Sequence, residues 1–197
     1  MDFTKKFRDL WARFWLRNVK FSGRYDDIKK LYAIKDPWNL GDPKERVRFA
    51  ETNARIKKIV PDCQSLLEIG CGEGFQTLEL LQVSRSVSGI DISPLAIKRA
   101  ELNCPRATFK VGKAEDLSEL FKGQRFDLVT AFEVLYYAPD IPKVIAELQK
   151  LSDRLLVTNY LSRAEKMRQY FSGPGWSKLD SIVVVDTTWE CDIWQRP

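Results

Sequence analysis

The chain has 197 residues, 44% hydrophobic and 30% charged, which suffices for one well-buried domain and leaves no room for a second catalytic domain. It contains no histidine and only four scattered cysteines, so we expect no metal site and exclude imidazole-based catalysis such as Ser-His-Asp triads. The net charge of +5 equals that of the first 30 residues, so the rest of the chain is neutral and nucleic acid is not the expected partner.

Residues 1–30 are predicted to form a basic amphipathic segment. Between residues 3 and 21, apolar side chains recur at helical spacing and basic residues lie between them. A helix packed on the domain or on a protein partner fits this pattern, and so does a helix lying on an anionic membrane. RNA contact and disorder are the remaining interpretations. Because the chain has no membrane-span-like run and no signal-peptide core, we expect a cytoplasmic protein, peripheral to the membrane under the second interpretation.

Residues 31–197 are predicted to form the main domain, which starts with a lid and a helix over residues 31–60. The stretch 25–39 is expected to be a flexible loop around Asp36-Pro37-Trp38, since proline fixes its own dihedral angle and restricts the residue before it. A helix over residues 44–60 can begin near Pro43. Its predicted apolar face comprises Val47, Ala50, Ala54, Ile56 and Ile59.

A buried strand followed by three glycines is the most informative feature of the chain. Leu66-Leu67-Glu68-Ile69 predicts a parallel strand, and the alternating Gly70, Gly72 and Gly74 allow the backbone to approach a ligand closely. After a helix over about residues 75–83, a second strand ends at Asp91, where a carboxylate can accept both hydroxyls of a ribose. This order of elements predicts a nucleoside-cofactor site.

Strands and helices alternate over the remainder of the chain. A helix beginning near Pro94 has Ser93 as its expected N-cap. Further strands are predicted at 107–111, 126–131 and 155–158, with helices at 142–151 and 162–171 and a final antiparallel pair at 181–186 and 188–194. The sequence therefore predicts an α/β, Rossmann-like seven-stranded sheet, mostly parallel with one antiparallel strand and with helices on both faces. Its ligand crevice is expected at the carboxyl ends of the strands.

The glycine spacing indicates which nucleoside is bound. Gly-x-Gly-x-Gly differs from the Gly-x-Gly-x-x-Gly of dehydrogenases and resembles motif I of the class I S-adenosylmethionine-dependent methyltransferases, with Glu68 and the three glycines in its places. A dehydrogenase and a Rossmann-like domain without a ligand are the alternatives. Two further runs, Asp36-Pro37-Trp38 with Asp42-Pro43-x-Glu45-Arg46-x-Arg48, and Phe126-Asp127-Leu128-Val129 with Glu133-Val134-Leu135-Tyr136-Tyr137, resemble the nodulation protein S family. Those enzymes are N-methyltransferases that act on a deacetylated chitooligosaccharide. The resemblance runs from about Tyr32 to Leu148.

The resemblance implies S-adenosylmethionine as the cofactor. By this resemblance, Asp91 binds the ribose and Ile92 packs on the adenine. The other implied cofactor contacts are Glu68, Gly70, Cys71, Gly72, Gly74 and Glu133. Arg48 is the candidate for the cofactor carboxylate, which a guanidinium binds bidentately, and a surface arginine paired with Glu45 or Glu51 is the alternative. Lys113 stands where many relatives carry the acid that reads the adenine amino group. Either Glu115 or Asp116 takes that role, or backbone groups such as the Ala114 amide do.

Methyl transfer from a sulfonium requires mainly that the acceptor lone pair be oriented behind the methyl group. An amine acceptor needs only to be neutral, whereas a hydroxyl would profit from a general base, for which Glu133, Tyr136 and Tyr137 are candidates. In the alternative interpretation, Glu133 caps a helix or orients the cofactor and the tyrosines form an aromatic wall. Tyr32, Trp38 and Tyr136 are the candidate substrate contacts, because aromatic faces can shape a methyl channel and stack on a sugar ring.

Three functions are consistent with these features. The first is a small-molecule methyltransferase whose acceptor is a saccharide or a related metabolite. The second is an RNA methyltransferase, which the basic N-terminus favours and the neutral remainder of the chain disfavours. The third is a non-catalytic cofactor-binding subunit that docks a partner or a membrane through residues 3–21. The sequence leaves the oligomeric state open.

Overall fold

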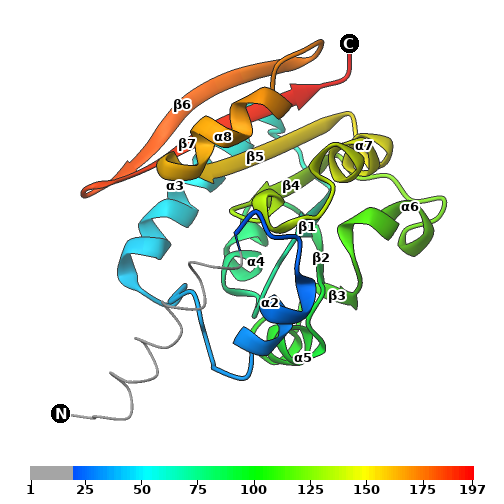
Figure 1. The fold of residues 1–197 in the computed structure, drawn as a ribbon. Helices are drawn as coiled ribbons and strands as arrows, with labels where there is room; N and C mark the ends of the chain where they lie inside the picture. Colours follow the sequence, from blue (N-terminus) through cyan, green and yellow to red (C-terminus); the bar gives the residue numbers. More distant parts are fainter. Residues whose placement is uncertain (1–19) are drawn as a thin grey trace.

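Seven strands form one sheet in the computed structural model, which describes residues 20–197 (Figure 1). The strand order is β3-β2-β1-β4-β5-β7-β6. Strands β1 to β5 are parallel, and β7 is antiparallel to both of its neighbours. The strands are β1 (Ser65–Ile69), β2 (Ser86–Asp91), β3 (Thr108–Val111), β4 (Leu128–Phe132), β5 (Arg154–Tyr160), β6 (Trp176–Val184) and β7 (Thr187–Gln195). The predicted mostly parallel sheet with one antiparallel strand is confirmed.

The helices α3 and α5 begin directly after residues whose side chains cap them. Asp42 accepts a hydrogen bond from the Lys44 amide and Ser93 accepts one from the Ala96 amide, and a proline follows each cap directly. The predicted N-cap at Ser93 is therefore confirmed. The helices are α2 (Tyr25–Leu31), α3 (Pro43–Ile59), α4 (Phe75–Leu80), α5 (Pro94–Asn103), α6 (Leu117–Leu120), α7 (Ile141–Leu151) and α8 (Leu161–Met167), with 3-10 turns η1 (Ala114–Asp116), η2 (Leu135–Tyr137) and η3 (Arg168–Tyr170).

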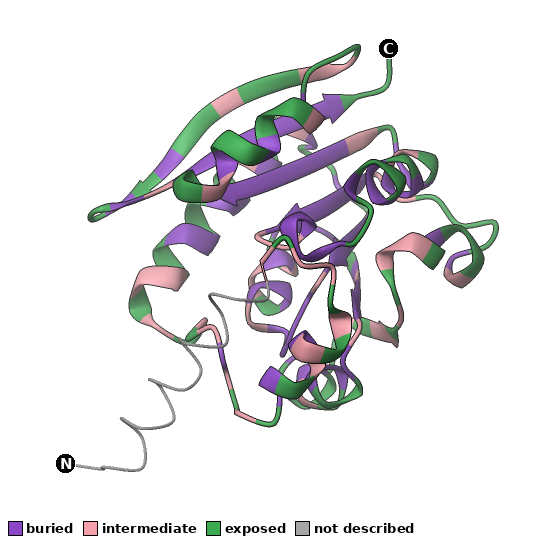
Figure 2. Cartoon of the chain, in the orientation of Figure 1, coloured by how far each residue is buried: buried purple, intermediate pink, exposed green. Residues whose placement is uncertain are grey.

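Two hydrophobic clusters cover the two faces of the sheet. Leu66 of β1 packs with Ile56 of α3 and with α4 on one face. The next residue, Leu67, packs with Leu148 of α7 and with α8 on the other face, because successive side chains of a strand point in opposite directions. Figure 2 shows the central strands buried and the edge strand β6 largely exposed. Helices on both faces therefore leave the strand ends as the place where a ligand can reach the sheet.

The prediction for the buried face of α3 holds at Ile56 and in part at Ile59, which is half-buried, and is wrong at Val47, Ala50 and Ala54. The buried residues of this helix include Phe49, Thr52 and Asn53, whereas Val47 is 50% exposed. Sequence hydrophobicity is misleading here because two polar side chains bond to backbone: the Thr52 hydroxyl to the Arg48 carbonyl, and the Asn53 amide to the Glu79 carbonyl of α4. The contacts of α3 with α4 and β6 therefore decide which face is buried.

The stretch predicted as a loop over residues 25–39 contains the helix α2. Its first turn carries Asp26 and Asp27 and its last turn carries Lys29 and Lys30, a distribution that complements the helix dipole. Ile28 is buried in the same cluster as α7. The sequence predicts that the main domain starts after residue 30, but helix α2 continues across this position. The buried face of α2 packs in the core of the main domain.

The N-terminal segment reaches the domain at Phe21. Its amide donates to the Tyr136 carbonyl at 2.7 Å, and the two rings lie 5.8 Å apart. Residues 3–19 of the predicted amphipathic helix lie outside the described residues. From residue 20 onward, no helix is long and apolar enough to cross a membrane.

Candidate functional site

A cavity of about 590 Å³ lies at the carboxyl ends of the central strands, where the sequence predicts the ligand crevice. This volume is within the range of small-molecule and cofactor sites, about 300–1,000 Å³. Residues of β1, β2 and β4 and of the loops after them line it, together with α2, α3 and the loop between them. Of the predicted site residues, those that line it are Tyr32, Trp38, Arg48, Glu68, Gly70, Cys71, Gly72, Asp91, Ile92, Ala114, Glu133, Tyr136 and Tyr137.

The glycine turn after β1 requires glycine at the two positions that line the cavity. Gly70 and Gly72 have φ of +68° and +55°, a region that side chains other than glycine rarely adopt. A Cβ atom on Gly70 would lie 2.3 Å from the Val134 side chain, and one on Gly72 would lie 3.1 Å from the Tyr32 hydroxyl. The turn is tied to β2 through the Gly70 amide, which donates to the Ile90 carbonyl at 2.7 Å. Bare backbone therefore faces the cavity at Gly72.

Three predicted cofactor residues do not line the cavity. Gly74 is the N-cap of α4, and a Cβ atom there would lie 3.2 Å from the backbone of Ala100, so this glycine allows α4 and α5 to pack closely. Glu115 accepts the Tyr25 hydroxyl at 2.9 Å on both carboxylate oxygens, and Tyr25, not Glu115, lines the cavity. Asp116 lies beside it in η1, also outside the cavity lining.

Asp91 ends β2 directly beside the glycine turn. Its Oδ2 accepts from the Gly72 amide at 3.1 Å and from the Tyr32 hydroxyl at 3.2 Å, and its Oδ1 accepts from the Ser93 amide at 2.9 Å. Burial raises the pKa of this carboxyl from 3.8 to about 6, and the hydrogen bonds to the charged form oppose that rise. The carboxylate thus faces the cavity, held by two backbone amides and one side chain.

Two buried donors in the cavity wall lack acceptors. Arg48 is 3% exposed, and its Nε donates to Glu45 at 2.6 Å, but its Nη1 has no partner among the described residues. Gln76, at the start of α4, is 5% exposed, and its Nε2 also has no partner there. Buried donors nearly always have a partner, so this part of the cavity suits a ligand that accepts hydrogen bonds. The pairing with Glu45 occurs as one interpretation expected, although Arg48 is not on the surface.

Glu68 near the end of β1 and Cys71 in the glycine turn are both buried. The buried Glu68 carboxylate accepts the Thr77 hydroxyl of α4, and burial raises its pKa to about 7. Burial likewise raises the pKa of the Cys71 thiol well above its ordinary value, so that this thiol is neutral at physiological pH. The neutral Cys71 thiol is a weak nucleophile, and both side chains line the cavity.

Glu133 follows β4, and its backbone is strained. Its φ is +56°, which is uncommon for a residue other than glycine and which directs the side chain to the cavity. The carboxylate accepts the Tyr160 amide at 2.8 Å, the Thr158 hydroxyl at 3.2 Å and the Tyr136 hydroxyl at 3.3 Å. Burial raises its pKa to about 7, against the opposing effect of the nearby Arg48 charge. This carboxyl can therefore exchange a proton near neutral pH.

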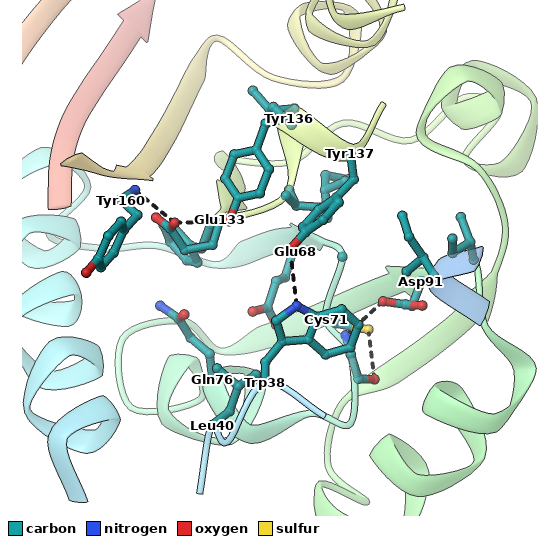
Figure 3. A pocket seen from close by; sticks show the side chains of 18 of the residues that line it. Trp38, Leu40, Glu68, Cys71, Gln76, Asp91, Glu133, Tyr136, Tyr137 and Tyr160 are labelled. Atoms are coloured by element: carbon teal, nitrogen blue, oxygen red, sulfur yellow. Dashed lines mark hydrogen bonds between the residues drawn. The ribbon is translucent and has the colours of Figure 1, made fainter. Parts of the chain in front are cut away.

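An aromatic chain connects the two ends of the cavity. The rings of Tyr32 and Trp38 lie 4.9 Å apart, the Trp38 indole donates to the Tyr137 hydroxyl at 3.2 Å, and the rings of Tyr136 and Tyr137 lie 4.6 Å apart. In the view of Figure 3, Trp38 lies between Asp91 on one side and Glu133 on the other. The predicted aromatic residues therefore come together in one wall.

Hydrogen bonds anchor the loop that carries Trp38, which the sequence predicts as a lid. The Asp36 amide donates to Glu73 at 2.9 Å, and the Asp36 carboxylate accepts the amides of Leu40 and Gly41 at 2.7 and 2.9 Å. Glu73 follows Gly72 in the glycine turn and also binds Arg99 at 2.6 Å. Trp38 is therefore positioned by the same turn that faces the cavity.

Four residues at the far end of the cavity were not predicted. Tyr160 ends β5 and pairs with Trp189 of β7, Arg163 lies in α8, and Lys44 is in the first turn of α3. The rings of Tyr160 and Trp189 meet edge to face at 5.9 Å, and the Lys44 ammonium lies 5.9 Å from the Trp189 ring. The far end thus combines aromatic and basic groups. No sequence motif marks these residues, because only the pairing of β5 with β7 brings Tyr160 and Trp189 together.

The chain is similar to known methyltransferases. The family model described as "Methyltransferase domain" matches residues 62–172. Nodulation protein S of Bradyrhizobium diazoefficiens is 29% identical over 65% of this chain and 61% of its own length. The ubiquinone biosynthesis O-methyltransferase of Thiobacillus denitrificans is 30% identical over 74% of this chain and 56% of its own length. The chain therefore spans about 60% of the length of these two relatives.

The fold is also similar to that of solved structures. The N-methyltransferase NodS from Bradyrhizobium japonicum, in complex with S-adenosylhomocysteine, superposes with a TM-score of 0.70 at 22% identity, over 89% of this chain and all of that one. Magnesium protoporphyrin IX methyltransferase from Synechocystis, with bound S-adenosylmethionine, gives a TM-score of 0.62 at 18% identity, over 77% of this chain and 80% of that one. The seven-stranded sheet is thus the class I methyltransferase fold.

Proposed function

The chain belongs to the methyltransferase domain family, and we propose that it transfers a methyl group from S-adenosylmethionine to an amine or hydroxyl of a small molecule. The observation that carries this proposal is the Asp91 carboxylate beside the bare backbone of Gly72, in a cavity of about 590 Å³ at the carboxyl edge of the sheet. A carboxylate in this position suits a ribose, and the unsubstituted turn leaves room for the ligand. When bound, the cofactor supplies a sulfonium-activated methyl group.

The residues of this chain fit the amino-acid end of that cofactor as well as its nucleoside. The unpartnered donors of Arg48 and Gln76 line the cavity and suit the cofactor carboxylate. Ile92 and Ala114 line the opposite, nucleoside end near Asp91 and suit the adenine. We therefore assign the cofactor to the part of the cavity over β1 and β2, and the acceptor to the part over β4, β5 and β7.

Arg48→Lys is expected to weaken binding of S-adenosylhomocysteine about tenfold, because an ammonium does not reproduce a bidentate guanidinium contact with a carboxylate. 5′-Methylthioadenosine has the same nucleoside but no carboxylate for Arg48 to bind. Its affinity is therefore expected to change by less than about twofold. Titration calorimetry with both ligands measures the difference. An equal loss for both would show that Arg48 supports the fold of the site and not the carboxylate.

The chain's own groups can orient an acceptor and remove its proton. Glu133 follows β4, lines the cavity and accepts a hydrogen bond from the Tyr136 hydroxyl. Trp38, which donates to the Tyr137 hydroxyl, lines the same cavity. A hydroxyl acceptor could pass its proton to the Glu133 carboxylate, while a neutral amine would need only the orienting wall. The named relatives include an N-methyltransferase and an O-methyltransferase, so both acceptor types belong to the proposal.

The acceptor we propose is a saccharide or a related metabolite. The far end of the cavity presents the rings of Tyr160 and Trp189, and aromatic faces and edges suit the apolar faces of a sugar ring. Incubating the full chain with methyl-labelled S-adenosylmethionine and a panel of amino sugars, chitooligosaccharides and phenols tests this. Label in the amino sugars or the chitooligosaccharides supports the proposal, and label in the phenols alone would contradict it. An absence of calorimetric S-adenosylhomocysteine binding would refute the function altogether.

Trp38→Ala is expected to reduce kcat/KM for the labelled acceptor about 100-fold, because the acceptor loses the wall that orients it. The Kd for S-adenosylhomocysteine is expected to change far less. Trp38→Phe keeps an aromatic face but loses the bond to Tyr137, so its kcat/KM should lie between those of the unmodified chain and of Trp38→Ala. Steady-state kinetics and calorimetry on the same preparations provide the comparison, and equal losses in both quantities would count against an acceptor role.

A further inference from the structure

Helix α2 places two tyrosines in the nucleoside half of the cavity, each bonded to a carboxylate. Tyr25 is the first residue of α2 and Tyr32 is its C-cap, so they are seven positions apart, two helical turns, and lie on one face of the helix. Tyr25 donates to both oxygens of Glu115 at 2.9 Å, and Tyr32 donates to Asp91 at 3.2 Å. Both tyrosines line the cavity.

The hydrogen bonds of Asp91 leave too little capacity for a ribose. Its two oxygens already accept from the Gly72 amide, the Ser93 amide and the Tyr32 hydroxyl. A carboxylate has about four acceptor sites, so two ribose hydroxyls would exceed them. The two amides belong to the glycine turn and to the start of α5, which the sheet fixes. Tyr32 is therefore the donor that can leave.

Tyr32 also occupies the space that the glycine turn leaves open. Its hydroxyl lies 3.1 Å from where a Cβ atom of Gly72 would be. The side chain is 4% exposed, and burial together with the Asp91 charge raises its pKa well above 10, so it remains a neutral donor. At the adenine end, Tyr25 lines the cavity in front of Glu115, which does not line it.

We propose that Tyr25 and Tyr32 form an internal clasp that holds the nucleoside site in place of the ligand and that S-adenosylmethionine displaces it to bind. This inference rests on the proposed function and adds two residues that set cofactor affinity. Because Tyr32 packs on Trp38, and Trp38 bonds to Tyr137, release of Tyr32 also frees one side of the acceptor wall. Cofactor binding therefore precedes the final arrangement of the acceptor end.

Phenylalanine variants test the clasp, because they remove one hydroxyl and keep the ring. Tyr32→Phe is expected to bind S-adenosylhomocysteine about tenfold more tightly than the unmodified chain, because the ligand no longer has to break one hydrogen bond to a charged group. Tyr25→Phe is expected to bind it somewhat more tightly than the unmodified chain. Tyr170→Phe is the matched control, since Tyr170 packs at the edge of the same core but outside the cavity, and it should leave the affinity unchanged. Calorimetry on the full chain gives the three values.

Thermal unfolding supplies a second measurement. Without ligand, Tyr32→Phe should lower the Tm, because buried Asp91 loses a donor, and saturating S-adenosylhomocysteine should remove this difference. Unchanged or weaker binding by Tyr32→Phe, while the unmodified chain binds, would overturn the clasp and leave the proposed function intact. Binding by neither protein would refute the proposed function and the clasp with it. Tighter binding with a ligand-restored Tm supports both.

Discussion

Asp91→Asn is expected to weaken binding of S-adenosylhomocysteine at least about 100-fold, because two hydrogen bonds from a ribose to a charged carboxylate become weaker contacts with a neutral amide. Asparagine is preferable to alanine here. Asp91 also accepts the Gly72 and Ser93 amides, and an amide oxygen can retain one of these bonds where alanine would leave both donors buried. Calorimetry gives the affinity, and circular dichroism shows whether the fold is kept.

Asp127→Asn is the matched control for this variant. Asp127 also accepts backbone amides, those of Gln64 and Ser65, but it lies at the opposite end of the sheet and does not line the cavity. It should lower stability without changing ligand affinity. Comparable losses of affinity in both variants would mean that the ribose assignment is wrong.

The same site gives an expected pH dependence. The pKa of Asp91 in the free protein is raised to about 6, and the ribose hydroxyls need the deprotonated form as acceptor. Affinity should therefore be highest above pH 6 and fall as the pH decreases through that value, with the limit of about tenfold per pH unit for a single protonation. Asp91→Asn should not show this dependence.

Glu133→Gln is expected to reduce kcat for a hydroxyl acceptor by about 100- to 10,000-fold, the usual contribution of a general base. Glutamine keeps the size of the side chain and its amide oxygen can still accept the Tyr160 amide, so cofactor affinity should change little. With a neutral amine acceptor the loss should be much smaller, since no base is required. Initial rates with each acceptor class measure both effects.

The pH profile distinguishes a base from a structural carboxylate. With the pKa of Glu133 raised to about 7, the deprotonated base predominates above that value, so the rate should rise with pH through about 7. Glu133→Gln should remove this rise. Glu147→Gln, which changes a buried carboxylate on α7 that binds Ser118 outside the cavity, should retain it. A rise that persists in Glu133→Gln would assign the ionisation to another group.

The nucleoside half of the site was predictable because its signals are local in sequence. The strand before Gly70, the helix after it and the acid at Asp91 follow one another within one βαβ unit, and the parallel pairing of β1 with β2 then brings Asp91 to the turn. Gly74 belongs to the same motif, yet it serves helix packing, because its neighbour across the turn is Ala100 and not the cavity. A motif thus predicts the turn better than the role of each member.

The remaining site residues depend on contacts between distant segments. Gln76 carries no motif, and only its unpartnered, buried amide in the cavity wall marks it as part of the site. Tyr160 and Trp189 meet through the antiparallel pairing of β5 with β7. Helix α2 was not predicted because it has only seven residues and few of them are apolar. Packing against the core therefore decides its conformation.

The strand order has a consequence for how relatives of this chain can diverge. Because β4 stands between β1 and β5, the glycine turn and Asp91, which we assign to the nucleoside, and Tyr160 and Trp189, which we assign to the acceptor, come from separate stretches of polypeptide. Exchanging the terminal hairpin of β6 and β7, or the residues that follow β5, should redirect the enzyme to a new target molecule while its donor chemistry persists. Laboratory selection for altered preference can therefore include positions after residue 158, which lie apart in sequence from the glycine turn and Asp91.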